Sequence, residues 1–332
     1  MPKIVQFYEF GEADVLKLED HPLAEPGEGE VRLKVEAIGL NRAEVGFRAG
    51  RYLELPKTFP STLGYEASGV IDAIGSGVTG LQIGDRVSTI PAFSMLNYGT
   101  YGESAIVPAT AVAHYPETLS PTEGTAIWMA YIMAYGPLVE YGQVKADDFV
   151  LITAASSSVG YSAIQIAKTA GAVAIVTTRS NAKKQMLLDK GVDHVIVTND
   201  EDLVDCVMKI TNGHGADLIF DAVAGSLLET LAAAAAPGAT IFMYGALDDT
   251  AATPFPLFAA LQKGLKVQGY TLFEITTNPL KLEHAKQYIY EGLETRKLVP
   301  ILDRTFTLDQ IVEAHRYMES NQQNGKITIT VS

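Results

Sequence analysis

Apolar and polar side chains alternate in short stretches over the first 115 residues of the chain. In "GEVRLKVEAIGL" polar side chains separate Val31, Leu33 and Val35, which is typical of a half-buried β-strand. The stretch "ASGVIDAIGSGVTGLQIGDRVSTI" contains two apolar runs joined by a glycine-rich turn. This pattern predicts a small, mostly β domain.

The pattern changes from about Gly124, where "GTAIWMAYIMAYGPLVEYG" is an apolar segment of helix length. Apolar runs of strand length then alternate with segments of helix length. They predict an α/β fold with an open, mostly parallel, doubly wound sheet. The alanine run 232–236 is expected to form a close-packed helix. The strand candidates are "FVLITA", "AVAIVTT", "HVIV", "ADLIFDAV", "ATIFMYG" and "LKVQGY".

The C-terminal segment departs from this alternation. It predicts a strand, an amphipathic helix with Ile311, Ala314 and Met318 on one face, and a final strand "KITITV". A last strand that alternates in this way can return to the first domain.

Composition and charge narrow the class of protein. The chain has 332 residues, of which 47% are hydrophobic and 19% charged, which suits two globular domains. Its net charge of −14 argues against a general nucleic-acid-binding surface. The single Cys206 excludes an intramolecular disulfide framework and a zinc site built from a cysteine cluster. With no apolar signal core in "MPKIVQFYEF" and no apolar run of membrane-spanning length, we expect a cytoplasmic protein.

The stretch "FVLITAASSSVGYSAIQIAKTAGAVAIVTTRSNAKK" has the layout of a dinucleotide-binding βαβ unit. Its turn, "AASSSVG", carries serines where the usual fingerprint has glycines. Serine fits where φ stays negative, and its hydroxyl can contact a phosphate or cap the following helix. An ordinary capped helix is the alternative. The residues expected to bind the cofactor are Ala155, Ser157, Ser158, Val159 and Gly160.

The end of the second strand of this unit indicates which cofactor binds. An NAD site usually has an Asp or Glu there for the ribose 2′-hydroxyl. This chain instead has "TTRSNAKK", without a carboxylate before Asp189. An arginine can bind a 2′-phosphate through two hydrogen bonds. We therefore predict NADP(H), bound by Arg179, Ser180 and Lys184, although Lys183 and Lys184 can equally form a solvated helix face.

These features together resemble the medium-chain dehydrogenase/reductase superfamily, and within it the zinc-free quinone oxidoreductase-like branch. The resemblance implies a discontinuous GroES-like catalytic domain at 1–124 and 298–332, and a Rossmann NADP(H)-binding domain at 125–297. It also implies an active site in the cleft where the two domains meet. The motifs that carry it are "GLNRAEV", "LGYEASGVIDAIGSGVTGLQIGDRV", "YGTYGESAIVPA", "AASSSVGYSAIQIAK" and "NGKITITV".

The resemblance also predicts that no metal is used. Where zinc-bearing relatives have a cysteine ligand this chain has Asn41, and where they have Gly-His-Glu it has Gly64, Tyr65 and Glu66. Zinc needs three or four ligands in fixed geometry, and too few donors of the usual kind are present at these positions. The remaining histidines are scattered along the chain without ligand spacing.

Without a metal, hydride transfer to an electron-poor acceptor is less demanding than oxidation of an alcohol. Quinones and α,β-unsaturated carbonyls already draw charge onto oxygen, so one or two hydrogen-bond donors can stabilise it. The candidate donors are the Asn41 amide, the Tyr52 hydroxyl and Tyr65. Tyr52 can instead be a half-buried aromatic with no catalytic role.

Further contacts follow from the resemblance. Met133 replaces a threonine that often touches the nicotinamide, and Gly46 replaces a tyrosine. Both changes remove polar groups and favour an apolar acceptor pocket, for a quinone or a bulky enone. The remaining cofactor candidates, each of which can equally be a turn residue, are Ala222, Gly245, Asn324 and Lys326.

The sequence thus predicts a metal-independent NADPH-dependent reductase of quinones or of activated C=C bonds. The alternatives are a zinc-free NADP-dependent alcohol or aldehyde oxidoreductase and a non-catalytic NADP(H)-binding sensor. A homodimer, paired through the edge strand near "KVQGYTLF", is expected from the resemblance.

Overall fold

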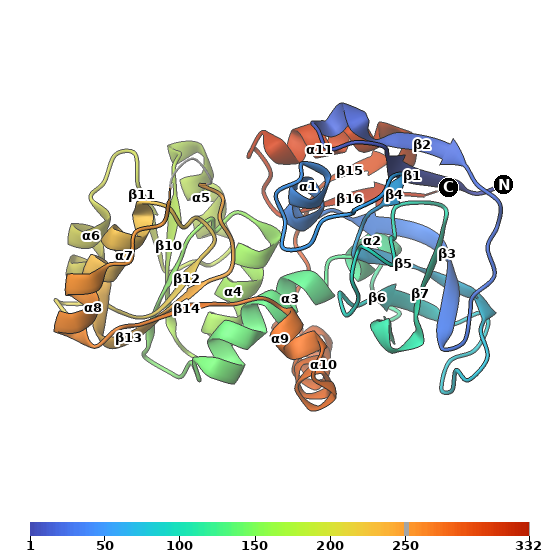
Figure 1. The fold of residues 1–332 in the computed structure, drawn as a ribbon. Coiled ribbons are helices and arrows are strands. Elements are labelled where there is room, and N and C mark those ends of the chain that lie inside the picture. Colours follow the sequence, from blue (N-terminus) through green and yellow to red (C-terminus); the bar gives the residue numbers. More distant parts are fainter. Residues whose placement is uncertain (249–251, 332) are drawn as a thin grey trace. The chain divides into compact units, whose positions relative to one another are not determined.

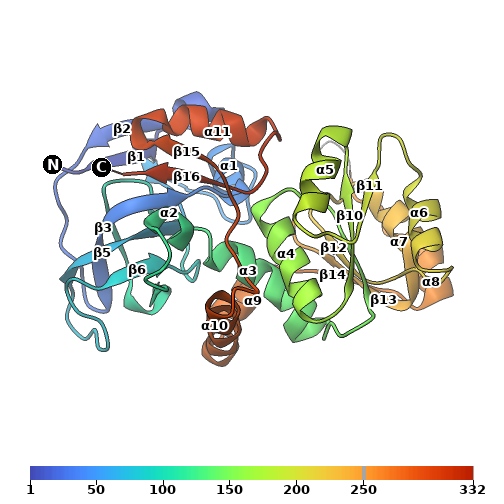
Figure 2. The ribbon, with the colours of Figure 1, turned by 180° about the vertical axis from the view of Figure 1, so that it is seen from behind.

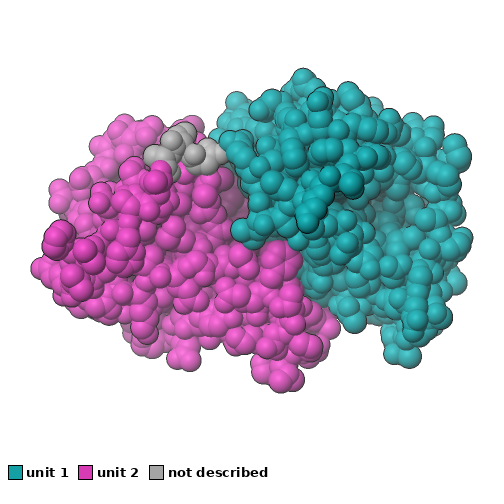
Figure 3. All heavy atoms as spheres, in the orientation of Figure 1, with its two compact units in different colours: residues 1–129, 300–332 teal, residues 130–299 magenta. Residues whose placement is uncertain are grey.

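The computed structural model describes residues 1–248 and 252–331 of the chain. These residues form two compact units, which Figure 3 colours separately. Unit 1 comprises residues 1–129 and 300–332, and unit 2 comprises residues 130–299. None of the helices in the described ranges combines the length and the apolar character needed to cross a membrane.

Unit 1 is built mainly of antiparallel strands. One sheet has the order β15-β16-β3-β5-β6-β8, with β7 also paired to β3, and a smaller sheet has the order β2-β1-β4. The strands are β1 (Lys3–Phe7), β2 (Lys17–Asp20), β3 (Glu30–Gly39), β4 (Ser61–Thr62), β5 (Glu66–Ile74), β6 (Arg86–Thr89), β7 (Ser104–Pro108), β8 (Val112–His114), β15 (Leu302–Thr307) and β16 (Lys326–Thr330).

The predicted strand containing Val31, Leu33 and Val35 is β3, and all three side chains are buried. Arg32 between them is also buried, which strict alternation did not predict. Its guanidinium lies 3.0 Å from Glu25 and 2.8 Å from Asp72, so a paired charge occupies what would otherwise be a solvent-facing position.

The C-terminal segment returns to unit 1, as its pattern suggested. Strand β16 runs antiparallel to β3, with Thr328 opposite Gly39, and Figure 2 shows it in red beside the blue β3. Helix α11 (Ile311–Glu319) buries Ile311, Ala314 and Met318, the face that the sequence predicted. The other helices of this unit are α1 (Arg42–Arg48) and α2 (Pro121–Gly124), with short 3-10 turns at Ala13–Val15, Ala109–Ala111 and Leu308–Gln310.

Within residues 130–248 and 252–299, a parallel sheet has the strand order β11-β10-β9-β12-β13-β14. This is the strand order of a dinucleotide-binding sheet. From β9 the chain adds strands first on one side (β10, β11) and then on the other (β12, β13, β14), so the reversal point of the strand order lies between β9 and β12. The predicted α/β fold class is confirmed. The strands are β9 (Phe149–Ile152), β10 (Val173–Thr178), β11 (His194–Val197), β12 (Ala216–Asp221), β13 (Ala235–Met243) and β14 (Lys266–Gly269).

Helices cover both faces of this sheet (Figure 1). Because both faces are covered, the inner strands β9, β10 and β12 are largely buried and consist mainly of apolar residues, whereas the edge strand β14 is partly exposed. The helices are α3 (Trp128–Tyr135), which begins in unit 1, the π-helix Gly136–Tyr141, α4 (Ser158–Thr169), α5 (Asn181–Asp189), α6 (Leu203–Ile210), α7 (Leu227–Ala234), α8 (Leu257–Lys263), α9 (Phe273–Thr276) and α10 (Pro279–Glu294).

The expectation of a helix over the alanine run 232–236 is wrong for its last two residues. Helix α7 ends at Ala234, and Ala235 begins β13 opposite Ala216 of β12. Alanine favours a helix by well under 1 kcal/mol over most residues, so pairing with a neighbouring strand can override that preference.

Candidate active site and cofactor site

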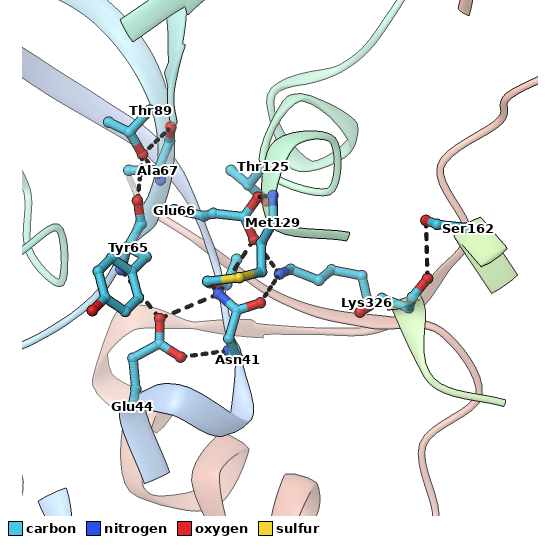
Figure 4. Close-up of polar contacts among 12 residues, drawn as sticks. Asn41, Glu44, Tyr65, Glu66, Ala67, Thr89, Thr125, Met129, Ser162 and Lys326 are labelled. Atoms are coloured by element: carbon cyan, nitrogen blue, oxygen red, sulfur yellow. Dashed lines mark hydrogen bonds and ion pairs between the residues drawn. The ribbon is translucent and has the colours of Figure 1, made fainter. Parts of the chain in front are cut away.

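A buried polar cluster in unit 1 brings together residues from the two ends of the chain (Figure 4). Asn41 precedes helix α1, Glu44 lies in its first turn, Glu66 begins β5 and Lys326 begins β16. The sequence predicted Asn41 and Lys326 as site residues but not Glu44, and it noted Glu66 only as part of a motif. We call these four residues the charged cluster.

The helix-start pattern of α1 explains how Glu44 enters this cluster. Asn41 is the N-cap, and three residues later Glu44 accepts its backbone N–H at 2.7 Å. The other Glu44 oxygen accepts the Tyr65 backbone N–H at 3.1 Å. Burial raises the pKa of Glu44 to about 7, although Lys326 and these hydrogen bonds act against the rise. The spacing Asn-x-x-Glu was the sequence signal for this residue.

Glu66 and Lys326 form a buried ion pair, and both carboxylate oxygens of Glu66 have a hydrogen-bond partner. One Glu66 oxygen accepts from the Lys326 ammonium, and the other accepts the Met129 backbone N–H at 2.8 Å. Lys326 is carried there because β16 pairs with β3, and nothing in the local sequence around it indicates this partner.

The orientation of the Asn41 amide follows from its neighbours. Its Oδ1 lies 2.6 Å from the Lys326 Nζ, which can only donate. Its Nδ2 lies 3.2 Å from Glu44 Oε1, 3.3 Å from Glu66 Oε2 and 3.3 Å from the Gly39 carbonyl. Both hydrogens of the amide are therefore directed into the cluster. In this arrangement Asn41 fixes the two carboxylates and has no hydrogen left for a bound acceptor.

Tyr52 and Tyr65 form a pair of hydroxyls beside this cluster, 3.4 Å apart. Tyr65 is buried against Phe93, whereas Tyr52 is half-exposed and packs edge-on against Phe47. Burial raises the pKa of Tyr52 to about 12 and raises that of Tyr65 further. Both phenols are therefore protonated near neutral pH and can donate hydrogen bonds.

Gly46, which replaces a family tyrosine, has a backbone reason to be glycine. A Cβ at this position would lie 2.8 Å from the Arg51 carbonyl oxygen. The loop returns there because the Arg51 N–H bonds to the Gly46 carbonyl at 2.8 Å. The turn that presents Tyr52 therefore excludes a side chain at position 46.

In unit 2 the serine-rich turn closes as a capped helix start. Ser157 is the N-cap of α4 and accepts the Gly160 N–H at 2.9 Å. The left-handed position of the turn, with φ of 48°, is Ala154, so the serines keep negative φ as the sequence reasoning required. A Cβ on Gly160 would lie 2.5 Å from the Ala155 carbonyl oxygen, so only glycine fits. Ser158 and Val159 form the first turn of α4.

The end of β10 presents the residues predicted for a 2′-phosphate. Arg179 is exposed and makes no hydrogen bond or ion pair to any described residue, and Ser180 caps α5 through the Ala182 N–H at 3.1 Å. Lys183 donates to the Ser156 hydroxyl at 3.0 Å, beside the serine turn. Lys184 lies 3.4 Å from Glu201 instead.

The sequence did not anticipate two carboxylates near this position. Asp200 accepts from the Asn181 amide at 2.5 Å, and Glu201 faces Lys184. Both come from the loop after β11, which parallel pairing with β10 brings alongside. Neither carboxylate forms a hydrogen bond or an ion pair with Arg179.

The other predicted cofactor residues lie at separate places in the fold. Ala222 follows β12, and its N–H bonds to the Thr153 hydroxyl at 2.9 Å while its carbonyl accepts from Leu247 at 3.0 Å. Both backbone polar groups of Ala222 thus have a partner within the protein. Gly245 is exposed beyond β13, Met133 is half-buried on α3, and Asn324 lies half-buried in the loop before β16.

Sequence reasoning missed the pair that organises the carboxyl edge of this sheet. Buried Asp221 accepts from the Thr153 hydroxyl at 2.7 Å and from the N–H groups of Val223 and Ala224 at 3.0 and 2.8 Å. Thr153 follows β9 and Asp221 ends β12, so the pair joins the two strands at the reversal point of the sheet. A short apolar run ending in Thr or Asp carries no specific signal for such a pair.

Two family models match the chain, and they agree with the two units. Residues 27–117 match the alcohol dehydrogenase GroES-like domain, and residues 158–286 match a model described as zinc-binding dehydrogenase. Human quinone oxidoreductase is 30% identical over 317 residues, which are 94% of this chain and 92% of that protein. The chain belongs to the medium-chain dehydrogenase/reductase superfamily. Within it the chain falls in the quinone oxidoreductase-like branch, so the predicted resemblance is confirmed.

Two further comparisons extend this assignment. The structure of Escherichia coli quinone oxidoreductase complexed with NADPH is 26% identical, with a TM-score of 0.89 over 99% of each chain. A phenolphthiocerol/phthiocerol polyketide synthase of Mycobacterium tuberculosis is 31% identical over 97% of this chain. The chain spans only 14% of the length of that synthase.

One of the two family models is described as zinc-binding dehydrogenase, so the residues of this chain can be compared with those that zinc requires. Where zinc-bearing relatives have their cysteine and histidine ligands, this chain has the Asn41 amide and the Tyr65 phenol. The Glu66 carboxylate beside them is paired with the Lys326 ammonium. No group of three or more His, Cys, Asp or Glu in residues 1–248 and 252–331 could hold a metal ion. These donors do not fit zinc, whose ligands are thiolates, imidazoles and carboxylates in tetrahedral geometry.

Proposed function

We propose that this chain is an NADPH-dependent reductase that delivers hydride to quinones or to the activated C=C bond of α,β-unsaturated carbonyls. The observation that carries the proposal is the Tyr52–Tyr65 hydroxyl pair beside the charged cluster. The ionised groups of that cluster bind one another, whereas the half-exposed Tyr52 hydroxyl can donate to a substrate.

Unit 2 supplies the residues that fit the cofactor. The N-terminus of α4, with its small turn residues and the Ser157 cap, suits a pyrophosphate. Arg179, exposed and without a partner among the described residues, suits a ribose 2′-phosphate. When bound, NADPH supplies the hydride, and the protein binds and orients the reactants.

Unit 1 would then stabilise the charge that develops on the acceptor. Hydride addition to the β-carbon of an α,β-unsaturated carbonyl, or to a quinone, leaves negative charge on oxygen. The half-exposed Tyr52 hydroxyl can donate to that oxygen while it accepts from Tyr65, and a proton then completes the product. The charged cluster holds α1 and the start of β5, and it thereby fixes the loop and strand that carry the two tyrosines.

The decisive experiment follows NADPH oxidation by EDTA-treated protein with a quinone and a 2-alkenal in parallel. We expect turnover of at least one of them. We also expect Tyr52→Phe to lower kcat by about 100-fold with unchanged NADPH affinity, because it removes one donor to a developing oxyanion. Val107→Ala, a buried substitution in the same unit away from these tyrosines, is the control for general destabilisation.

The outcomes separate the alternatives. NADPH binding with no turnover of either acceptor would favour a non-catalytic sensor, and reduction of a saturated aldehyde alone would favour an alcohol or aldehyde oxidoreductase. Loss of activity with EDTA that zinc restores would contradict the metal-free proposal. Full activity of Tyr52→Phe would remove the tyrosine from the proposed chemistry.

We also propose that the protein forms a homodimer through β14. This strand ends the sheet order, so one of its edges has no strand partner in the described part of unit 2. Helix α8, just before it, exposes Phe258 (84%) and Leu261 (72%). Light scattering should give twice the chain mass, and Phe258→Glu with Leu261→Glu should give the monomer.

A further inference from the structure

Tyr244, just beyond β13, has a buried hydroxyl with no described residue at normal hydrogen-bond geometry. Its ring stacks on Phe220 of β12, with centroids 4.0 Å apart and planes 16° from parallel. The stack fixes the direction of the side chain, and its backbone N–H bonds to the Asp221 carbonyl at 2.9 Å. The position of this hydroxyl is therefore set by the carboxyl edge of the sheet.

Ser157, the N-cap of α4, is the neighbour of this hydroxyl. Burial raises the pKa of Tyr244, the Asp221 charge adds to the rise, and the nearby Ser157 hydroxyl acts slightly against it. The phenol therefore keeps its proton near neutral pH. The two side chains come from opposite sides of the reversal point, since Ser157 follows β9 and Tyr244 follows β13.

The hydroxyls of Tyr244 and Ser157 together lack one hydrogen-bond acceptor among the described residues. The Ser157 oxygen already accepts the Gly160 N–H at 2.9 Å. If either hydroxyl donates to the other, the second O–H hydrogen still has no acceptor among the described residues. The Asp221 carboxylate accepts from the Thr153 hydroxyl and from the N–H groups after β12, and it makes no hydrogen bond to the Tyr244 hydroxyl.

A buried hydroxyl without a partner costs about 1–3 kcal/mol, and native proteins keep few of them. Here it lies at the N-terminus of α4, a helix of 12 residues, whose dipole and unbonded N–H groups attract an anion. The group that would satisfy all of these donors is an oxygen-rich anion.

We propose that the Tyr244 hydroxyl is a cofactor-binding donor that hydrogen-bonds, together with Ser157, to a phosphate oxygen of the dinucleotide. This inference rests on the proposed NADP(H) site and adds to it a residue outside the serine turn. In the absence of the cofactor the hydroxyl is an unsatisfied buried group, and binding of the cofactor removes that cost.

The test compares Tyr244→Phe with Tyr270→Phe. Both variants remove one buried phenol oxygen from unit 2, but Tyr270 donates to the Ile132 carbonyl at 3.1 Å. We expect Tyr244→Phe to weaken NADPH binding about tenfold by calorimetry, and to raise the Tm of the cofactor-free protein. Tyr270→Phe should instead lower the Tm, because it leaves the Ile132 carbonyl without its donor, and it should leave NADPH affinity unchanged.

A second ligand locates the effect at the bridging phosphates. Adenosine 2′-monophosphate carries the 2′-phosphate but no pyrophosphate, so its affinity should fall in Arg179→Ala and stay constant in Tyr244→Phe. Equal NADPH affinity of Tyr244→Phe and wild type would overturn the inference. Failure of the wild type to bind NADPH would instead overturn the proposed function, so the two failures are distinguishable.

Discussion

The charged cluster of unit 1 and the carboxyl edge of the sheet in unit 2 satisfy their buried polar groups to different extents. In the cluster, Asn41, Glu44, Glu66 and Lys326 bind one another with matched donors and acceptors. At the sheet edge, Thr153 and Asp221 are equally satisfied, but neither the Tyr244 hydroxyl nor the exposed Arg179 makes a hydrogen bond to a described residue.

This difference distinguishes polar groups that stabilise the fold from polar groups that are available to bind a ligand. A completed network stabilises the fold, and losing one member leaves the others buried without compensation. A donor without a partner costs stability in the unliganded protein and becomes favourable only when a ligand binds. Substitutions in the cluster should therefore change stability, and substitutions of unpartnered donors should change affinity.

The largest effect is expected for Lys326→Met. Removal of the ammonium leaves Glu66 charged, buried and unpaired, which should lower the free energy of unfolding by about 3–5 kcal/mol. Urea denaturation measures this loss. The control is Arg316→Met, which breaks the exposed Arg316–Asp14 pair and should cost less than about 1 kcal/mol. Similar losses in the two variants would mean that the buried pair is not structural.

The pH dependence of stability should report on Glu44. Its folded-state pKa of about 7 is above the unfolded value, so the proton it holds stabilises the fold below about pH 4. That contribution is lost as the pH rises through 7. Between pH 4 and pH 8, the stability of wild type relative to Glu44→Gln should fall by up to about 3 kcal/mol.

The contribution of buried His315 to stability depends on pH in the opposite direction to that of Glu44. It does not affect the difference in stability between wild type and Glu44→Gln. Burial lowers the pKa of His315 to about 3, so its contribution is present above about pH 6.5 and is lost as the pH falls. Because His315 is present in both proteins, its effect cancels in the difference. A difference that stays constant from pH 4 to pH 8 would show that Glu44 does not titrate in this range.

The next effect concerns affinity and cofactor choice. Arg179→Ala should weaken NADPH binding by about 10- to 100-fold, the range for a lost hydrogen bond between charged groups, while NADH affinity changes less than about twofold. Fluorescence titration with the two cofactors measures the ratio. Equal losses for both cofactors would assign Arg179 to another part of the dinucleotide.

The smallest effect distinguishes the two neighbouring lysines. Lys183 faces the serine turn through Ser156, whereas Lys184 faces Glu201. At about 0.15 M salt, Lys183→Ala should weaken NADPH binding about threefold and Lys184→Ala less than about twofold. A larger loss in Lys184→Ala would favour the original prediction, in which Lys184 binds the 2′-phosphate.

The sequence alone predicted the elements whose pattern is local. The alternating runs of unit 1, the strand–helix alternation of unit 2 and the buried face of α11 follow from side-chain periodicity. The Ser157 cap follows likewise, because hydroxyl caps act within three residues. The predicted end of the helix over the alanine run was wrong by two residues, because pairing between β12 and β13 decides where that helix ends.

Only the tertiary structure decided which distant groups became partners. Lys326 and Glu66 are 260 residues apart, and Thr153 and Asp221 are 68 apart. Asn41 could be selected from a motif, but the direction of its amide follows from charges that strand pairing places around it. Sequence periodicity determines which face of an element is buried, whereas the satisfaction of each buried polar atom depends on neighbours that only the folded chain brings within hydrogen-bond distance.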